Sequence, residues 1–296
     1  MTTLTQLITD TERQLSAAGV AFGHGTTNAR DEAAWLVLHA LGLPLDTDID
    51  GSEGKQPAAP DGQARTATLL KARIDTRQPL AYLLKEAWLQ GVPFYVDERA
   101  IVPRSLIAEV LADGSIDPWL SDQTRRVLDL CTGNGSLAVL AALAWPEVQV
   151  DAADLSVEAL AVARINVEKH GLKDRIKPIE SDGLHNCPGP YDLILCNPPY
   201  VNVASMAALP AEFRAEPALA LAGGADGMDF IRALLRDAPT RMNERAVLVL
   251  EIGHERTHFE TAFPRLNPVW LDTSAGGDQV LLLTKTMLSS RPSARN

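Results

Sequence analysis

The tetrapeptide Asn197-Pro198-Pro199-Tyr200 follows a run of apolar residues and combines residue types that can act on a nitrogen atom. Two prolines fix their φ angles, and their carbonyls have no local hydrogen-bond ladder to join. The Asn197 side-chain oxygen and the Pro198 carbonyl can therefore accept both hydrogens of one –NH₂ group. An amide or exocyclic amine nitrogen is a weak nucleophile, because its lone pair is delocalised. Two fixed acceptors increase its electron density and stabilise the positive charge that develops during alkylation.

The tetrapeptide therefore predicts alkylation of a planar –NH₂ group, with all four residues in the catalytic set and Tyr200 stacked on the substrate. Correct orientation of the nitrogen removes much of the entropic barrier. A general base is not obligatory, because the alkylated nitrogen is acidic enough to lose its proton to water. The alternative is a structural Asn-Pro-Pro turn. The motif alone leaves glutamine amide and nucleobase amine open, since adenine-specific DNA methyltransferases are similar here.

A glycine-containing turn follows an earlier apolar run and predicts a cofactor site. Its glycines allow a tight turn and a close approach to a ligand. A dinucleotide site would carry Gly-x-Gly-x-x-Gly, but Cys131 stands in the first glycine place and Leu137 follows the turn. The better match is the turn that faces the methionine moiety of S-adenosylmethionine. We therefore predict cofactor contacts from Asp129, Cys131, Thr132, Gly133, Asn134 and Gly135, with Asn197 at the same site.

Two further acidic residues end neighbouring strands of the expected sheet. Asp154 lies about 25 residues after Asp129, where a carboxylate can accept both ribose hydroxyls. Asp182 ends the next strand, where it can accept a hydrogen bond from the adenine amino group. Leu155 and Gly183 complete the predicted cofactor set. The alternative is that Asp154 and Asp182 only cap the segments that follow them. Three strand ends that each carry an acid or a glycine favour the cofactor site.

The elements that must position these residues alternate between strand and helix patterns from Arg125 onwards. This order predicts an α/β fold with a mostly parallel, seven-stranded, Rossmann-like sheet of the class I methyltransferase type, covered on both faces. Ligands in such sheets lie beyond the carboxyl ends of the strands. The expected strands are Val127–Leu130, Val148–Ala153, Ile176–Ile179, Tyr191–Cys196, Ala246–Ile252 and the antiparallel pair Val269–Asp272 and Gln279–Thr284, with helices over Leu137–Ala144 and Ser156–His170.

The N-terminal part of the chain has helical periodicity instead. We expect helices from Leu4 to Ala18, from Asn28 as N-cap to Gly42, and from Ala64 to Arg77, with an exposed loop over 46–62. Ala87–Val96 predicts a β-hairpin with a Gly-Val-Pro turn. The predicted organisation is a helical domain over 1–85, a hairpin linker over 86–103, a methyltransferase domain over 104–288 and a disordered tail over 289–296.

The bulk properties restrict the class of protein and its partners. The 296 residues are 46% hydrophobic, and no stretch approaches the ~18–20 apolar residues of a membrane span. The chain start lacks the pattern of a signal peptide, and the three cysteines and six histidines have no metal-ligand spacing, so a cytoplasmic protein without a metal is expected. A net charge of −11 argues against autonomous nucleic-acid binding and favours a basic partner.

With these residues in view, the chain resembles the protein-glutamine methyltransferases of the HemK/Prm type over nearly its whole length. Within that family it is most similar to the branch that modifies ribosomal protein L-three of the large subunit, not to the branch that modifies peptide chain release factors. In particular, Cys131 stands where the release-factor branch favours glycine. The resemblance rests on Asn28–Ala33, Ala81–Leu83, Ala87–Trp88, Phe94–Arg99, Val102–Ser105, Asp129–Gly133 and Leu209–Pro217.

The resemblance implies that the helical domain over 1–85 recognises the protein substrate and that the catalytic domain is seven-stranded. It also implies that Asn197, Pro198 and Tyr200 surround the target glutamine and that S-adenosyl-L-homocysteine is the second product. The basic ribosomal protein would be the substrate, and its target position and the oligomeric state of the enzyme stay open. The chain departs from the family at Asn134, where Ser or Thr is usual, and at Gly183-Leu184-His185, which replaces a more apolar pair. Release-factor methylation, adenine methylation of nucleic acid and a non-catalytic ribosome-assembly role remain as alternatives.

Two residues outside these sets, Arg104 and Glu251, have two interpretations each. Arg104, near the domain junction, contacts substrate or attaches the hairpin to the catalytic domain. Glu251 faces the pocket or caps the helix that follows it, and we favour the cap. Cys131 and Cys196 are expected to lie close together at neighbouring strand ends as buried free thiols.

Overall fold

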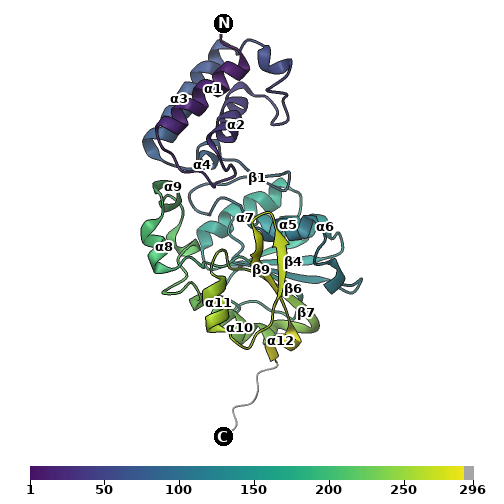
Figure 1. The fold of residues 1–296 in the computed structure, drawn as a ribbon. Coiled ribbons are helices and arrows are strands. Elements are labelled where there is room, and N and C mark those ends of the chain that lie inside the picture. The colour runs from purple at the N-terminus through teal and green to yellow at the C-terminus, as the bar shows by residue number, and fades with distance from the viewer. Residues whose placement is uncertain (290–296) are drawn as a thin grey trace.

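A seven-stranded sheet forms the centre of the larger part of the molecule in this computed structural model, which describes residues 1–289 (Figure 1). The strand order is β5-β4-β3-β6-β7-β9-β8. Strand β9 is antiparallel to both of its neighbours, and all other pairs are parallel. The strands are β3 (Arg126–Leu130), β4 (Gln149–Asp154), β5 (Ile176–Glu180), β6 (Tyr191–Cys196), β7 (Met242–Glu251), β8 (Val269–Thr273) and β9 (Gly276–Thr284). The predicted fold class is confirmed.

Helices cover both faces of this sheet, which explains the continuous apolar runs of its inner strands. Successive strand residues point to opposite faces. Val127 therefore packs with α5 (Ile107–Ala112) and α6 (Ser136–Ala144), whereas Leu128 packs with α10 (Asp229–Asp237) and α11 (Arg256–Ala262). The remaining elements of this part are α7 (Val157–Lys169), α8 (Val203–Ala208), α9 (Ala211–Arg214), α12 (Lys285–Ser289), and the 3₁₀ turns η2 (Asp117–Trp119), η3 (Ala218–Ala220) and η4 (Ala238–Arg241).

The N-terminal helices share an apolar core that is distinct from the cores on the two faces of the sheet. They are α1 (Leu4–Ala17), α2 (Ala29–Leu41), α3 (Pro60–Thr76) and α4 (Leu80–Leu84), with the 3₁₀ turn η1 (Glu53–Lys55) in the loop. Asn28 caps α2 by accepting a hydrogen bond of 2.9 Å from the Asp31 N–H, and Gly42 ends it with φ +70°. Helix α3 begins four residues earlier than expected, because a proline without an N–H fits the first helical position. Helix α4 was not expected.

The linker contains the predicted hairpin, but its turn differs from the expectation. Strands β1 (Ala87–Leu89) and β2 (Val92–Phe94) are joined by Gln90 and Gly91, which have φ +50° and +73°. The predicted Gly-Val-Pro turn is wrong, because Val92 and Pro93 are paired strand residues and a two-residue hairpin turn needs positive φ at both positions.

The linker contributes side chains to both cores. Ala87, Val96 and Val102 pack with the N-terminal helices, whereas Phe94 packs against the sheet and its helices. The division of the chain at residues 85 and 103 therefore stays a prediction.

The C-terminal end of the described chain is α12. Ser289, which the sequence placed in a disordered tail, is the last residue of this helix, and the rest of that predicted tail lies outside the described residues. Within residues 1–289, no helix combines the length and the apolarity needed to cross a membrane.

Buried ion pairs join the segment around α9 to the N-terminal helices and to the linker. Glu212 contacts Arg77 at 2.7 Å and Arg73 at 3.3 Å, and all but Arg77 are fully buried. Glu216 accepts two hydrogen bonds of 2.7 Å from Arg104 and one of 2.9 Å from the Val102 N–H. Burial opposes ionisation of Glu216, but the charge and hydrogen bonds of Arg104 dominate and lower its pKa to about 2.

We expect Glu216→Gln to destabilise the protein by about 3–5 kcal/mol at pH 7, because it leaves the Arg104 charge without its buried partner. The pKa of Glu216 is below its ordinary value of 4.5, so its contribution is complete above that pH and is lost as the pH falls from 4.5 to about 2. Urea unfolding measures the free energy of unfolding of each protein. The difference in this free energy between variant and wild type should therefore become smaller as the pH falls across this range.

The control is Glu98→Gln, which removes an exposed pair with Lys85 and should cost less than about 1 kcal/mol. Equal losses in the two variants would contradict a special contribution from the buried pair.

Candidate active site

The carboxyl ends of three adjacent strands bring the predicted site residues together. Leu130 of β3 pairs with Ala153 of β4 and with Cys196 of β6, so the residues that follow each strand share one edge of the sheet. A cavity opens at this edge. Its lining includes the predicted residues Cys131, Gly133, Asp154, Leu155, Asp182, Gly183, Asn197 and Pro199.

The other predicted cofactor residues shape the turn and do not line this cavity. Asp129 is fully buried, and its Oδ2 accepts hydrogen bonds from the Thr132 hydroxyl at 2.5 Å and the Ala138 N–H at 2.9 Å. Burial raises the pKa of Asp129 to about 7. A Cβ on Gly135 would lie 3.1 Å from the Cβ of Ala163, so this glycine permits close packing of α6 on α7. Asn134 is buried, and its amide nitrogen has no hydrogen-bond partner among residues 1–289.

Asp154 connects the glycine turn with the next strand. Its Oδ2 accepts a hydrogen bond of 2.8 Å from the Gly133 N–H, and its Oδ1 accepts one of 2.9 Å from the Ser156 N–H. Burial raises the pKa of Asp154. Each carboxylate oxygen keeps a free lone pair, so one group can support the turn and also accept hydrogen bonds from a ligand.

The cavity has the properties that a bound S-adenosylmethionine would require. Gly133 and Gly183 have φ +57° and +51°, and a Cβ built on either would meet no atom within 4 Å. Both glycines therefore leave open space at the cavity wall. Within residues 1–289, the exposed Asp182 carboxylate has no hydrogen-bond or ion-pair partner. A free acceptor beside two open glycines fits a polar, planar ligand such as adenine.

The tetrapeptide lies at the same edge, directly after β6. Asn197 and Pro199 line the cavity, whereas Pro198 is buried and Tyr200 is directed toward β7. In the described part of the chain the Asn197 amide has no hydrogen-bond partner. The Tyr200 hydroxyl donates to Glu251 Oε1 at 3.2 Å, and a Cβ on Gly253 would lie 2.5 Å from the Tyr200 ring.

Glu251 accepts hydrogen bonds both from Tyr200 and from the residues that directly precede α5. Its Oε2 accepts hydrogen bonds from the Ser105 hydroxyl at 2.6 Å and from the Leu106 N–H at 2.9 Å, directly before α5. The favoured interpretation, a cap on the helix that follows Glu251, is wrong, because the side chain points back to α5 and to Tyr200. Burial raises the pKa of Glu251 and, first among several causes, that of the Tyr200 hydroxyl.

Arg104 joins the end of the linker, not the hairpin itself, to the segment around α9. It donates a hydrogen bond of 3.2 Å to the Val102 carbonyl, it pairs with Glu216, and its guanidinium lies 5.6 Å from the centre of the Phe213 ring. It does not line the cavity, and attachment of the hairpin stays a prediction.

Several lining residues were not among the predicted site residues. Arg99, Ala100 and Ile101 come from the linker, and Pro217, Leu219, Ala220 and Phe230 come from the segment after α9 and from α10. Asn166 of α7 orients the linker by accepting from the Tyr95 N–H at 2.7 Å and donating to the Tyr95 carbonyl at 2.9 Å. Tertiary packing brings the lining residues of the linker and of the segment after α9 to the cavity. No sequence motif connects them with the strand ends, so the sequence did not predict their position.

The two cysteines at the strand ends are neighbours, as predicted. A hydrogen bond between the thiols of Cys131 and Cys196, followed by burial, raises the pKa of Cys131 well above its ordinary value. Cys131 also has φ +61°, a conformation that favours glycine. Cys131 is therefore a neutral thiol of the cavity wall. It is half-buried, not fully buried as expected, because it faces the cavity, whereas Cys196 is buried and does not line it.

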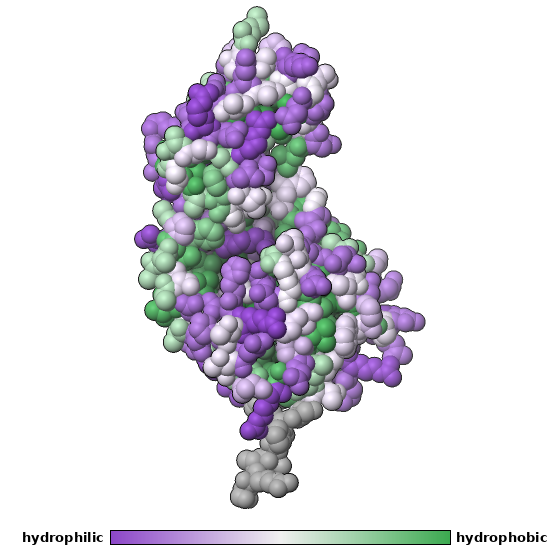
Figure 2. Space-filling model, in the orientation of Figure 1, coloured by the Kyte–Doolittle hydropathy of each residue, from purple (hydrophilic) through white to green (hydrophobic). Residues whose placement is uncertain are grey.

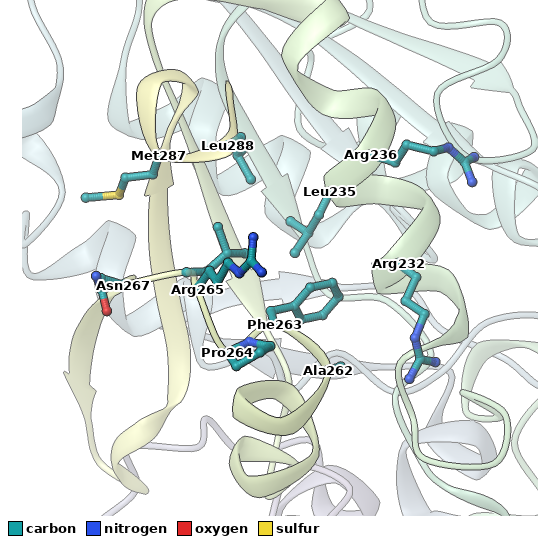
Figure 3. Close-up of a pocket in the computed structure, with 11 residues that line it drawn as sticks. Arg232, Leu235, Arg236, Ala262, Phe263, Pro264, Arg265, Asn267, Met287 and Leu288 are labelled. Atoms are coloured by element: carbon teal, nitrogen blue, oxygen red, sulfur yellow. The ribbon is translucent and has the colours of Figure 1, made fainter. Parts of the chain in front are cut away.

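A larger cavity, of about 800 Å³, lies away from this edge, between α10, the segment after α11, and α12 (Figure 3). Leu235, Phe263 and Leu288 contribute to its apolar lining, and Arg232, Arg236 and Arg265 contribute charge. Arg232 and Arg236 are already paired with neighbouring aspartates, and no lining residue is acidic or nucleophilic. The chemistry of the chain is concentrated at the strand ends instead.

The family model for the methyltransferase small domain matches residues 113–224. The chain is 54% identical to the protein of Bordetella pertussis named ribosomal protein uL3 glutamine methyltransferase, over 97% of both chains. It is 48% identical to the protein of that name in Burkholderia pseudomallei, over 95% of this chain and 94% of that protein. The solved catalytic domain of hMettl16 in complex with an RNA hairpin shares the fold alone, with 14% identity, a TM-score of 0.51, and coverage of 75% of this chain and 80% of that chain. The chain is a methyltransferase and belongs to the family of the ribosomal protein uL3 glutamine methyltransferases.

Proposed function

We propose that this enzyme transfers the methyl group of S-adenosylmethionine to the side-chain amide nitrogen of a glutamine in ribosomal protein uL3. One observation carries the chemistry. The Asn197 amide lies in the cavity at the end of β6, beside the glycine turn, and has no partner among the described residues. The printed names of the relatives, at 54% and 48% identity over nearly the full length, support the substrate.

The cofactor would lie across the ends of β3, β4 and β5. S-adenosylmethionine supplies an electrophilic methyl group on a sulfonium centre. Gly133 admits the methionine part close to the backbone, Asp154 accepts hydrogen bonds from the ribose hydroxyls, and Asp182 accepts one from the adenine amino group. The open space at Gly183 leaves room for the adenine ring.

The target amide would enter beside Asn197. The Asn197 side-chain oxygen and the Pro198 carbonyl accept its two N–H hydrogens, which localises electron density on the nitrogen. Because positive charge develops on this nitrogen only during transfer, the two acceptors stabilise the transition state more than the bound substrate. The pair also restricts the amide to the orientation needed for attack.

Tyr200 and Glu251 would position the substrate and would not transfer a proton. Glu251 accepts three hydrogen bonds, from Tyr200, Ser105 and Leu106, so its oxygens are occupied within the fold. The methylated amide is acidic enough to release its proton to water. Glu251 therefore acts as a positioning residue that fixes the Tyr200 ring against the planar substrate.

The central experiment measures methyl transfer from labelled S-adenosylmethionine to purified uL3 and, in parallel, to a peptide chain release factor, with mass spectrometry of the product. We expect a methylated glutamine in uL3 alone. Asn197→Ala should lower kcat by about 10²–10³-fold, the cost of removing one transition-state hydrogen bond, while cofactor affinity measured by calorimetry persists.

Each other result would require a different conclusion. Label on the release factor alone would keep the mechanism and replace the substrate. Label on neither protein would exclude both and make a nucleic-acid amine the next substrate to test. Unchanged turnover of the Asn197 variant would contradict the proposed acceptor role.

A second variant tests the position of Tyr200. Gly253→Ala would place a Cβ 2.5 Å from the Tyr200 Cε2, so we expect the ring to move and kcat to fall by about 100-fold. The control is Gly91→Ala in the hairpin, which has a similar positive φ but no atom within 4 Å of the added Cβ. Both variants carry the backbone strain of a positive φ, and only Gly253→Ala adds the clash with Tyr200, so equal turnover in the two would refute a catalytic effect of Tyr200 displacement.

A further inference from the structure

Helix α8 (Val203–Ala208) is unusual because it buries none of its residues. The stretch 203–211 contains no charged side chain, and only Ser205 is polar. Val203, its first residue, is 63% exposed. We call Val203, Ala204, Met206, Ala207 and Ala208 the α8 surface. Figure 2 shows green and pale green side chains on the flank where α8 and α9 lie. A soluble surface helix ordinarily presents charged residues on its outer face.

The α8 surface is held in place at both ends although it packs on little. Asn202 caps the helix by accepting a hydrogen bond of 2.9 Å from the Ser205 N–H, and it donates one of 2.7 Å to Glu255 Oε1. Beyond the helix, Glu212 is buried in its ion pairs with Arg73 and Arg77. The chain therefore presents a fixed apolar helix to solvent, where transfer of apolar area from water would be favourable.

The position of α8 relates this surface to the substrate. Val203 follows Tyr200 by three residues, so their Cα atoms lie at most about 11 Å apart. The helix of six residues extends roughly 9 Å further. Leu219, which lines the cavity, is itself 56% exposed. A glutamine that inserts its side chain beside Asn197 must leave its own backbone and its flanking residues on the surface around this opening.

We propose that the α8 surface is the docking site for the polypeptide segment of uL3 that flanks the target glutamine, and that it binds uncharged, apolar side chains of that segment. This inference rests on the proposed function. Val201, two residues before this surface, pairs with Leu221 and Gly223, which follow the cavity-lining residues Leu219 and Ala220. A net charge of −11 on the enzyme complements the basic remainder of a ribosomal protein. Charge attraction then favours the encounter of enzyme and substrate, and the α8 surface binds the apolar residues next to the glutamine.

Opposite charges at one position distinguish apolar docking from simple charge attraction. Val203→Glu and Val203→Lys each place a charge where we expect apolar contact, so both should raise KM for uL3 by about tenfold or more, with cofactor affinity unchanged. If only charge mattered, the Glu variant would bind the basic substrate more tightly and the Lys variant more weakly. Opposite effects, or no effect in either variant, would overturn apolar docking.

The matched control is Leu143→Glu, because Leu143 is 47% exposed near the C-terminal end of α6. That end of the helix lies toward the amino ends of the strands, away from the site, since α6 runs back from the carboxyl edge. This variant should leave KM for uL3 and kcat unchanged. An equal rise in KM in this control would assign the effect to general surface charge and refute specific docking.

Hydrogen exchange of the wild-type enzyme gives a readout that does not depend on turnover. Addition of uL3 with S-adenosyl-L-homocysteine should protect the amides of 203–211. Protection of these amides without methyl transfer to uL3 would support binding at the α8 surface and would contradict the proposed function. Methyl transfer with unprotected amides and unchanged Val203 variants would keep the function and exclude the docking site.

Discussion

The parallel pairing of β3 with β4 on one side and β6 on the other is the constraint on which the site depends. This register places Leu130 beside both Ala153 and Cys196, so three segments that are far apart in the chain end at one edge. The backbone hydrogen bonds of the sheet set the relative height of these ends. The sheet therefore brings the glycine turn, Asp154 and Asn197 to one place even where they do not contact each other directly. The helices on both faces stabilise the strands by burying apolar side chains.

A second layer of organisation joins this edge to the N-terminal helices. The segment after the tetrapeptide carries Glu212 and Glu216, which are buried against Arg73, Arg77 and Arg104. Removing such charges from water is costly, and apolar residues would often stabilise a fold as well. Charged pairs, however, accept few alternative arrangements. We infer that they give the segment one position relative to the linker, and the linker in turn contributes Arg99, Ala100 and Ile101 to the cavity.

The buried acidic groups at the site suit a methyl transfer that needs no strong base. Burial raises the pKa values of Asp129, Asp154 and Glu251, and the thiol of Cys131 is kept neutral by Cys196 and by burial. These groups serve as hydrogen-bond acceptors or wall residues within the fold, and Glu251 orients Tyr200. A reaction that needs two oriented acceptors and no strong base suits such surroundings, because the amide nitrogen is activated by hydrogen bonding alone.

The sequence by itself determined the succession of the seven strands along the chain, the helices α1 to α3, α6 and α7, the fold class and the residues at the strand ends, but it did not predict α4, α5 or the helices α8 to α12. The predicted features follow from local periodicity, from caps such as Asn28, and from the tetrapeptide after β6, all of which act over a few residues. It did not determine the hairpin turn at Gln90 and Gly91, the direction of Glu251 or the partner of Arg104. Only the tertiary structure decided these, because each depends on groups from distant parts of the chain, and a side chain that can face either a helix or a pocket is directed by whichever donors the packing brings within reach.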